Sequence, residues 1–435
     1  MRAAAFLYPW DVAGDPAAAR RVADLGAQQV TLAAAYHSTR ALTPRHPRHR
    51  VVTARHAAVL YPPDAERWAG RALRPYPQDW VADPDPFDVA ARTLADAGLE
   101  VHSWVVLAHN TRLGTEHPAI AVRNAYGDRY PWAPCIARPE VRAYLRDLAA
   151  EAAARPGARG TELESCGWYG LAHPHAHDKI GGVPLSGAAQ YLMSLCFCEV
   201  CEAGYTGLGV RAEEVRGAVV RALEPVWAGA EGRGKGETGG GRAGEWRGVE
   251  EMLGGELSVL VRRWRDDAAR TLQREVVAAV RGAARDGFRV LLHADPAAHR
   301  CGANAGVDPA DVLAHADGVV VPCTGDDADR TDALLPFVEA RAVAGVGFDT
   351  PPGSLPGSVS GSLPDAPSVP VVAANLTVVA AMGGRPGALA ADAAHAAALG
   401  AGELRLYHAG LAGNGDLAAV RRGLVAVRRA SATVR

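Results

Sequence analysis

Lysine is nearly missing from this sequence, since only Lys179 and Lys235 among its 46 basic residues are lysines. A Schiff-base enzyme needs a desolvated lysine inside its pocket. Lys235 lies in a glycine-rich tract and Lys179 in an expected loop. We therefore do not expect Schiff-base chemistry, and we attribute the arginine bias to a GC-rich genome rather than to phosphate recognition.

Long apolar runs and a strong net charge are also absent. No stretch is long enough to span a bilayer, and residues 3–10 form too short an apolar run for a signal peptide. The formal net charge is -2 with 22% charged residues, which indicates no nucleic-acid or membrane surface. We expect a cytoplasmic protein with a small-molecule or oligosaccharide substrate, and we leave open whether it forms a homo-oligomer.

Cysteine is scarce, at seven residues, and this odd number includes three residues within six positions. Such a set is typical of thiols or metal ligands in a reducing compartment rather than of a disulfide framework.

Short apolar runs alternate with helical stretches along the chain, which is the pattern of βαβ units on a parallel sheet. Eight runs are present, and eight is the strand number of a TIM barrel. The predicted fold is therefore α/β, a single (β/α)₈ TIM-barrel domain over residues 1–435. For the seventh strand, Val343–Phe348 is an alternative to Pro370–Leu376. The runs are Ala3–Tyr8, Gln29–Ala35, Glu100–Leu107, Gly160–Ser165, Phe288–Ala294, Gly318–Pro322, Pro370–Leu376 and Glu403–Tyr407.

Two long insertions are predicted, one after strand two (Ser38 to Pro86) and one after strand four (about Gly167 to Val249). Insertions that follow strands lie at the C-terminal face of a barrel, where the active sites of such enzymes are found. Within the second, the glycine-rich residues 228–244 are expected to be disordered. Residues 351–368, rich in Pro, Gly and Ser, are expected to form an irregular loop.

The fourth run carries two carboxylates, Glu162 and Glu164, which strand alternation places on one face while Leu163 takes the other. Two buried carboxylates are costly unless they are hydrogen-bonded, paired or used. Their repulsion is expected to raise one pKa, which suits a general acid beside an ionised partner. The alternative is an edge strand with both glutamates in solvent, but the aromatic residues 165–170 favour a pocket rim.

The cysteine triplet Cys196, Cys198 and Cys201 has the spacing Cys-x-Cys-x-x-Cys, compact enough for three thiolates to meet one zinc ion. Cys135 is the best candidate for the fourth ligand, ahead of Cys166 or a histidine from residues 173–177. The alternative is a set of small buried side chains without metal. A structural zinc is thus the one cofactor considered, and no organic cofactor is expected.

The order of a strand-four Glu, an insertion and this cysteine triplet resembles glycoside hydrolase family 42, the β-galactosidases with two catalytic glutamates. The resemblance covers about Cys135 to Tyr205 and includes the segment around Arg142, although Ile136 replaces a proline of the family pattern. It implies that Glu164 is the acid/base and that the cysteines bind a structural zinc. The family's nucleophile, a Glu ending strand seven, has no counterpart here, because that run offers only Asn375.

Polar side chains follow many of the predicted strands, and such convergence on one rim is typical of barrel enzymes. We predict that these residues contact substrate, together with His173 of a histidine-rich loop that could instead hold a metal. The predicted contacts are Tyr36, His37, His109, Asn110, Trp168, Tyr169, His173, His293, Asn375 and His408.

The leading hypothesis is a glycoside hydrolase in which Glu164 donates a proton, Glu162 or Asp295 is the anionic partner, and Trp168 and Tyr169 stack on a sugar. Asp326 and Asp327 are further candidates for the second carboxylate. Glycine-rich loops at residues 382–384 and 410–415 would suit phosphate, so a sugar-phosphate isomerase or epimerase is the alternative. A non-catalytic sugar-binding barrel is the third hypothesis.

Overall fold

The computed structural model describes residues 1–171, 179–229, 241–346 and 369–433. At its centre, eight parallel strands close into a barrel, because β1 pairs with both β14 and β2. These strands overlap all eight predicted runs, and Val343 lies in a helix instead of competing for the seventh place. The strands are β1 (Arg2–Leu7), β2 (Gln29–Tyr36), β6 (Glu100–Val106), β9 (Gly160–Glu164), β10 (Arg289–Asp295), β12 (Gly318–Pro322), β13 (Val371–Thr377) and β14 (Glu403–Tyr407).

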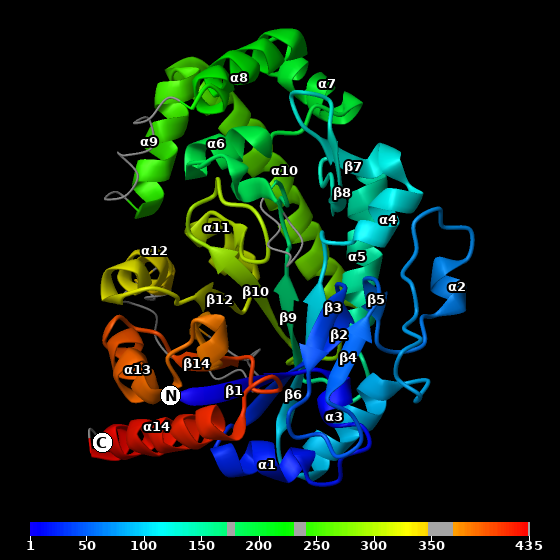
Figure 1. Ribbon diagram of the computed structural model, residues 1–435, viewed down its shortest axis with the longest axis vertical. Coiled ribbons are helices and arrows are strands. Elements are labelled where there is room, and N and C mark those ends of the chain that lie inside the picture. Colours follow the sequence, from blue (N-terminus) through cyan, green and yellow to red (C-terminus); the bar gives the residue numbers. More distant parts are fainter. Residues whose placement is uncertain (172–178, 230–240, 347–368, 434–435) are drawn as a thin grey trace, which may run out of the picture.

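A helix follows each barrel strand before the next one begins, which confirms the (β/α)₈ TIM-barrel fold (Figure 1). Side-chain caps begin several of them. Asp85 accepts the amide of Asp88 at 3.0 Å ahead of α3, where Pro86 occupies the first turn. The helices are α1 (Ala18–Leu25), α3 (Pro86–Asp96), α5 (Pro139–Ala153), α10 (Gly255–Ala283), α11 (Pro309–His315), α12 (Asp327–Val346), α13 (Leu389–Ala398) and α14 (Asn414–Thr433).

Strand alternation divides the buried side chains into two sets. Outward residues such as Leu163, Leu292 and Leu404 belong to the large apolar core under the helices. A smaller cluster, which includes Phe6 and Trp104, lies within the barrel. Glu162 and Glu164 alternate with Leu163, so they face this interior, as predicted.

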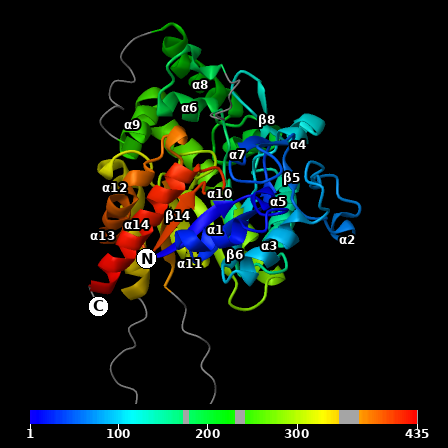
Figure 2. The ribbon, with the colours of Figure 1, turned by 60° about the horizontal axis from the view of Figure 1, so that its bottom comes forward.

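Further elements connect strands to helices at the C-terminal face. Between β2 and α3 lie β3 (Thr39–Leu42), β4 (Val51–Ala54), β5 (Ala58–Val59) and α2 (Ala65–Trp68). Between β6 and α5 lie α4 (Thr111–Glu116), β7 (Ala121–Arg123) and β8 (Arg129–Pro134). Between β9 and α10 lie α6 (Gly187–Met193), α7 (Glu199–Gly207), α8 (Ala212–Trp227) and α9 (Gly241–Leu253). Figures 1 and 2 show α6, α8 and α9 gathered at one end of the molecule.

Of the segment predicted to be disordered, residues 230–240 lie outside the described residues, and so does the predicted loop 351–368. Residues 241–244 differ from the prediction, because they form the first turn of α9. The physical reason is Arg242, whose guanidinium is held by Asp295 and Asp332. In the described part of the chain, no helix has the length and apolarity needed to cross a bilayer.

Candidate active site

Glu164 ends β9 and lies in the upper part of the barrel interior, with only 6% of its surface exposed. Trp104 Nε1 donates a hydrogen bond to Glu164 Oε2 at 2.8 Å. Burial raises the pKa of Glu164, while His293 and the Trp104 hydrogen bond oppose that rise. The direction agrees with the prediction, but the cause is burial rather than repulsion from Glu162. The carboxyl group can therefore keep its proton above the usual glutamate range.

Aromatic rings surround this carboxyl group. Tyr36 meets Trp104 edge to face at 4.6 Å between ring centroids, and Tyr8 meets Tyr36 in the same way at 4.9 Å. Burial together with the Glu164 charge raises the pKa values of Tyr8, Tyr36, Tyr169 and Tyr407, so all four phenols lie within its electrostatic reach. The site is thus a carboxyl group in a mostly aromatic surround.

Glu162 has a different setting from its neighbour two residues on. It is fully buried, and Arg405 Nε donates to its Oε1 at 2.5 Å. Although burial raises its pKa, Arg405 and His293 outweigh that effect and lower the pKa to about 2. Glu162 is therefore an ionised group deeper in the barrel than Glu164, at a level that we call the barrel floor. There Arg405 neutralises its charge and solvent is excluded. The geometry does not support its predicted part as the anionic partner at the substrate.

His293, on β10, approaches Glu162. Its Nε2 is 3.5 Å from Glu162 Oε2, and its charge affects the pKa of Glu164. The ring is nearly buried and meets Phe6 at 5.7 Å between centroids. His293 is thus a predicted site residue that contacts Glu162 and lies within electrostatic reach of Glu164.

Asp295, the other predicted partner, is engaged by two arginines. Arg242 approaches both oxygens at 2.8 and 2.9 Å, and Arg300 NH1 lies 3.2 Å from Oδ2. Asp326 Oδ1 accepts the amides of residues 328 and 329 at the start of α12, and Asp327 is exposed and pairs with Arg330. None of these carboxylates is a free partner for Glu164, because each is occupied by cations or amides.

Several predicted contact residues gather at the same rim. The ring of His109 stacks on Tyr169 at 4.5 Å, and His37 stacks on Tyr36 at 4.2 Å. His408 stacks on Tyr8 at 4.3 Å, is fully buried, and burial lowers its pKa to about 3. These rings extend the aromatic surround beyond Glu164.

Other predicted contacts have structural roles. Trp168 is buried, donates to the carbonyl of Arg265 at 2.9 Å and lies under that guanidinium, so it cannot stack on a sugar as expected. Asn110 caps α4 by accepting the amide of Leu113 at 3.0 Å. Asn375 is half-buried on β13, and its Oδ1 has no partner among the described residues. His173 lies outside the described residues.

Three amides of the glycine-rich loops are already paired within the fold. The amides of Gly383 and Gly384 donate to Ala380 and Val379 carbonyls at 3.0 Å. The amide of Gly410 donates to Phe6 at 3.1 Å. Backbone donors that are already paired within the fold cannot also hold an anion.

Five residues of the site were not among the predicted contacts, of which Tyr8 and Tyr407 belong to the aromatic surround. Trp104 and Arg405 lie in predicted strands at positions that alternation points inward, so the period of two could have identified both. Asp11 follows β1 and accepts the amide of Tyr8 at 2.8 Å, while its Oδ1 has no partner among the described residues. Burial raises the pKa of Asp11 to about 7. The sequence carries no signal for that burial.

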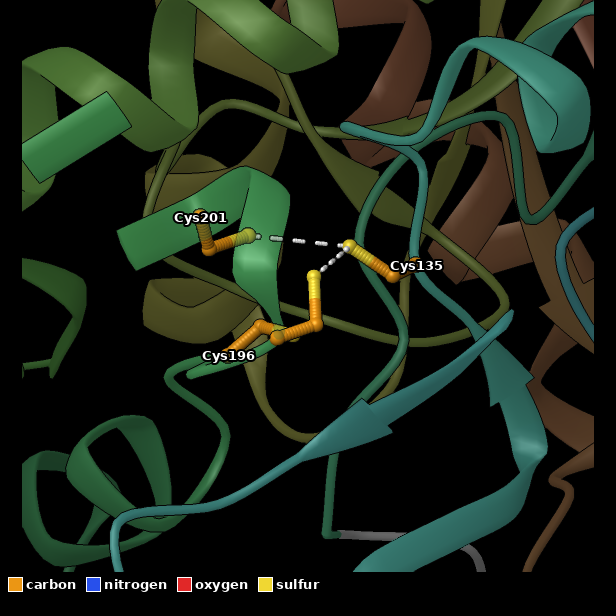
Figure 3. Close-up of side chains that lie close together, drawn as sticks. Cys135, Cys196 and Cys201 are labelled. Atoms are coloured by element: carbon orange, nitrogen blue, oxygen red, sulfur yellow. Dashed lines mark hydrogen bonds between the residues drawn. The ribbon is translucent and has the colours of Figure 1, made fainter. Parts of the chain in front are cut away.

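Four cysteines form a second cluster, away from Glu164. The sulfur atoms of Cys135, Cys196, Cys198 and Cys201 lie within 4.8 Å of one another, and all four residues are buried. Figure 3 shows Cys135 reaching toward the others from the segment after β8, while Cys196 lies in the segment before α7 and Cys201 in the first turn of α7. The structure thus brings Cys135 to the triplet, as predicted, and leaves Cys166 apart.

This donor set fits a tetrahedral metal ion. Cys135 Sγ is 3.7 Å from Cys198 Sγ and 3.6 Å from Cys201 Sγ. A zinc ion about 2.3 Å from four sulfurs places those sulfurs about 3.8 Å apart. Hydrogen bonds from the neighbouring thiols, Cys135 first, lower the pKa of Cys198. Four buried thiols at this spacing could therefore hold a metal ion.

Comparison with known proteins shows a shared fold without close sequence similarity. No protein-family model matches the chain, and no curated protein matches it. α-L-Fucosidase isoenzyme 2 from Paenibacillus thiaminolyticus is similar with a TM-score of 0.55 and 12% identity over 99% of this chain and 50% of the fucosidase.

Gan42B, a family 42 β-galactosidase, is similar with a TM-score of 0.50 and 10% identity over 99% of this chain and 57% of its own. A catalytic mutant of Gan42B from G. stearothermophilus gives the same TM-score with 9% identity, over 99% of this chain and 57% of its own. The chain thus spans half to three-fifths of the length of these structures. What the chain shares with these glycoside hydrolases is the TIM-barrel fold.

Proposed function

We propose that this chain is a carbohydrate-active enzyme of glycoside hydrolase type, with Glu164 as the proton donor. The observation that carries the proposal is the setting of Glu164 at the end of the fourth strand, hydrogen-bonded to Trp104 among aromatic rings, with a pKa raised by burial. A raised pKa keeps the carboxyl group protonated until the glycosidic oxygen needs the proton. The barrel fold shared with glycoside hydrolases supports this assignment.

The surrounding residues have separate parts in this proposal. Tyr36 and Tyr169 are nearly buried rings that keep the surroundings of the carboxyl group apolar. Trp104 holds one oxygen of Glu164 through its hydrogen bond, and His293 opposes the rise of the Glu164 pKa electrostatically. We assign Glu162 to the barrel floor, because its charge is neutralised by Arg405.

A non-catalytic sugar-binding barrel is the second candidate. The observation that favours it is the engagement of both predicted partners, Glu162 by Arg405 and Asp295 by Arg242 and Arg300. Glycoside hydrolases ordinarily use a second carboxylate beside the acid. Turnover therefore separates the two candidates, since a binding protein would hold a sugar without releasing a product.

Incubating the full chain with a panel of nitrophenyl glycosides tests the proposal. We expect release of nitrophenol from at least one sugar, with a kcat/KM of at least about 10⁴ M⁻¹s⁻¹, the lower end of the usual enzyme range. A panel of sugar phosphates serves as the comparison for isomerase chemistry, read by NMR of the products. Saturable sugar binding without any release would favour the binding barrel instead.

We further propose that the cysteine cluster binds one structural zinc ion. Its four buried thiols match the closed, four-sulfur sets of structural zinc sites. The ion would join the segment after β8 to the start of α7. Beside it, Arg123 of β7 donates a hydrogen bond to the Phe197 carbonyl at 2.8 Å. The part of the ion is to stabilise the loops beside the barrel mouth.

Replacing one ligand tests this zinc site. Purified wild-type protein is expected to contain about one zinc per chain by elemental analysis, and Cys201→Ser is expected to retain less than about a tenth of it, because a closed site needs all four sulfurs. Cys323→Ser is the matched control, since Cys323 is buried outside the cluster. Equal zinc content in Cys201→Ser and Cys323→Ser would contradict the assignment.

A further inference from the structure

A hollow at the C-terminal face lies between the segment after β1 and the β3–β4 hairpin. Its volume is about 530 Å³, within the range of small-molecule sites. Two tryptophans, an arginine, two histidines and an aspartate are among its lining residues, namely Trp10, Trp80, Arg48, His46, His49 and Asp83. Glu164 does not line it.

Stacked rings connect the hollow to Glu164. Trp10 stacks on Tyr8 at 4.5 Å between centroids, and Tyr8 in turn lies parallel to Trp104 at 6.0 Å. Trp104 is the residue that donates to Glu164. Trp80 packs against the same cluster from the rim. Trp10 is 1% exposed and Tyr8 2%, so these rings form a buried stack between the hollow and Glu164.

The segment around the hollow is strongly basic. Residues 37–63 contain five arginines and four histidines and no acidic residue. Three of the arginines are engaged, Arg45 with the carbonyls of residues 409, 410 and 412, Arg50 with the His46 carbonyl, and Arg55 with Asp79. The other two, Arg40 and Arg48, are exposed.

Arg48 is placed to meet a ligand in the hollow. Its backbone is fixed, because its amide donates to His46 Nδ1 at 3.2 Å and His46 Nε2 contacts the carbonyl of Ala13 at 3.0 Å. Its guanidinium makes no ion pair with any residue in the described ranges. Asp83, the acid in the lining, accepts the amide of Asp85 through Oδ1 at 3.0 Å. The lining thus holds one arginine outside ion-pair distance of any described carboxylate, Asp83 included, beside the half-buried indole of Trp80.

We propose that this hollow is a subsite for an acidic pyranose, a sugar ring that bears a carboxylate. The ring would pack against the half-buried indole of Trp80, above the buried ring of Trp10, and Arg48 would pair with the carboxylate, as guanidinium groups do. This inference rests on the proposed function for the choice of a carbohydrate ligand. It adds to that function a preference for acidic saccharides, set by a residue remote from Glu164.

Binding of matched sugars tests the subsite without requiring turnover. The probes are the methyl glycosides of glucuronic and galacturonic acid, with those of glucose and galactose as neutral counterparts, titrated against the full chain by calorimetry. We expect at least one acidic sugar to bind about fivefold more tightly than its neutral counterpart, the effect of about 1 kcal/mol from a solvent-screened charge pair. High salt is expected to reduce this difference.

Three variants locate the binding. Arg48→Met should remove the preference for the acidic sugar without weakening the neutral one, and Trp80→Ala should weaken both. Arg40→Met, the matched control on the same hairpin, should change neither. Absence of saturable binding by either acidic sugar, or an unchanged preference in Arg48→Met, would overturn the inference.

The outcomes separate this inference from the proposed function. A chain that hydrolyses no glycoside but loses its acidic preference in Arg48→Met keeps the subsite and refutes the hydrolase. A chain that hydrolyses neutral glycosides and shows no acidic preference keeps the hydrolase and refutes the subsite.

Discussion

Glu164→Gln is expected to lower kcat/KM about a thousandfold for a glycoside with a poor leaving group, such as a methyl glycoside. The glutamine preserves the size of the side chain and its contact with Trp104 but cannot donate a proton to the leaving oxygen. A loss of this size lies within the range of general acid catalysis. Sugar binding should survive, because the aromatic rings remain in place.

The leaving group distinguishes a proton donor from a residue that only shapes the site. A dinitrophenyl glycoside needs little protonation, so its kcat/KM should fall far less in Glu164→Gln than that of the methyl glycoside. Glu213→Gln, on the exposed face of α8, is the matched control and should leave both rates unchanged. Equal losses for both leaving groups would contradict the assignment of Glu164 as the acid.

Arg405→Met is expected to lower the free energy of unfolding by about 3 to 5 kcal/mol, because it leaves the Glu162 carboxylate buried without its partner. Both side chains of this pair are fully buried. The lowered pKa of Glu162 means that the pair stabilises the fold above the ordinary glutamate range and that this contribution is lost as the pH falls toward about 2. Urea unfolding at neutral and acidic pH measures both effects.

Two further variants test the origin of this loss. Combining Arg405→Met with Glu162→Leu should recover most of the stability, since an apolar pair removes the unpaired charge. Arg55→Met breaks an exposed ion pair with Asp79 and should leave the free energy of unfolding unchanged within error. If Arg405→Met alone has the same free energy of unfolding as Arg55→Met, the Glu162–Arg405 pair does not stabilise the barrel floor.

The fold could be predicted because its signal is local and repeated. Each barrel strand is a short apolar run between helical stretches. Glycines near helix ends, such as Gly98, mark where a helix stops and the chain turns back to the next strand. The ordered start of α9 could not be predicted from composition. There Arg242 is fixed by Asp295, a contact across more than fifty residues that local propensity does not encode.

The site was predicted in part, for a related reason. Alternation placed Glu162 and Glu164 on one face, but the different parts of the two depend on depth in the barrel and on Arg405, which comes from the last strand. The aromatic context of Trp168 was similarly misleading, because the Arg265 guanidinium that covers it lies on α10. Side chains from distant segments decide the pKa and exposure of each group. The spacing of residues along the sequence does not reveal which of these side chains pair.

The pH dependence of kcat/KM for a poor-leaving-group glycoside, in wild type and Glu164→Gln, tests the central claim most directly. Because burial raises the pKa of Glu164, wild-type activity should persist above the usual glutamate range and fall as the pH rises through the raised value. That alkaline limb should be missing from the residual activity of Glu164→Gln. The same limb in both proteins would show that another group supplies the proton and would contradict the account.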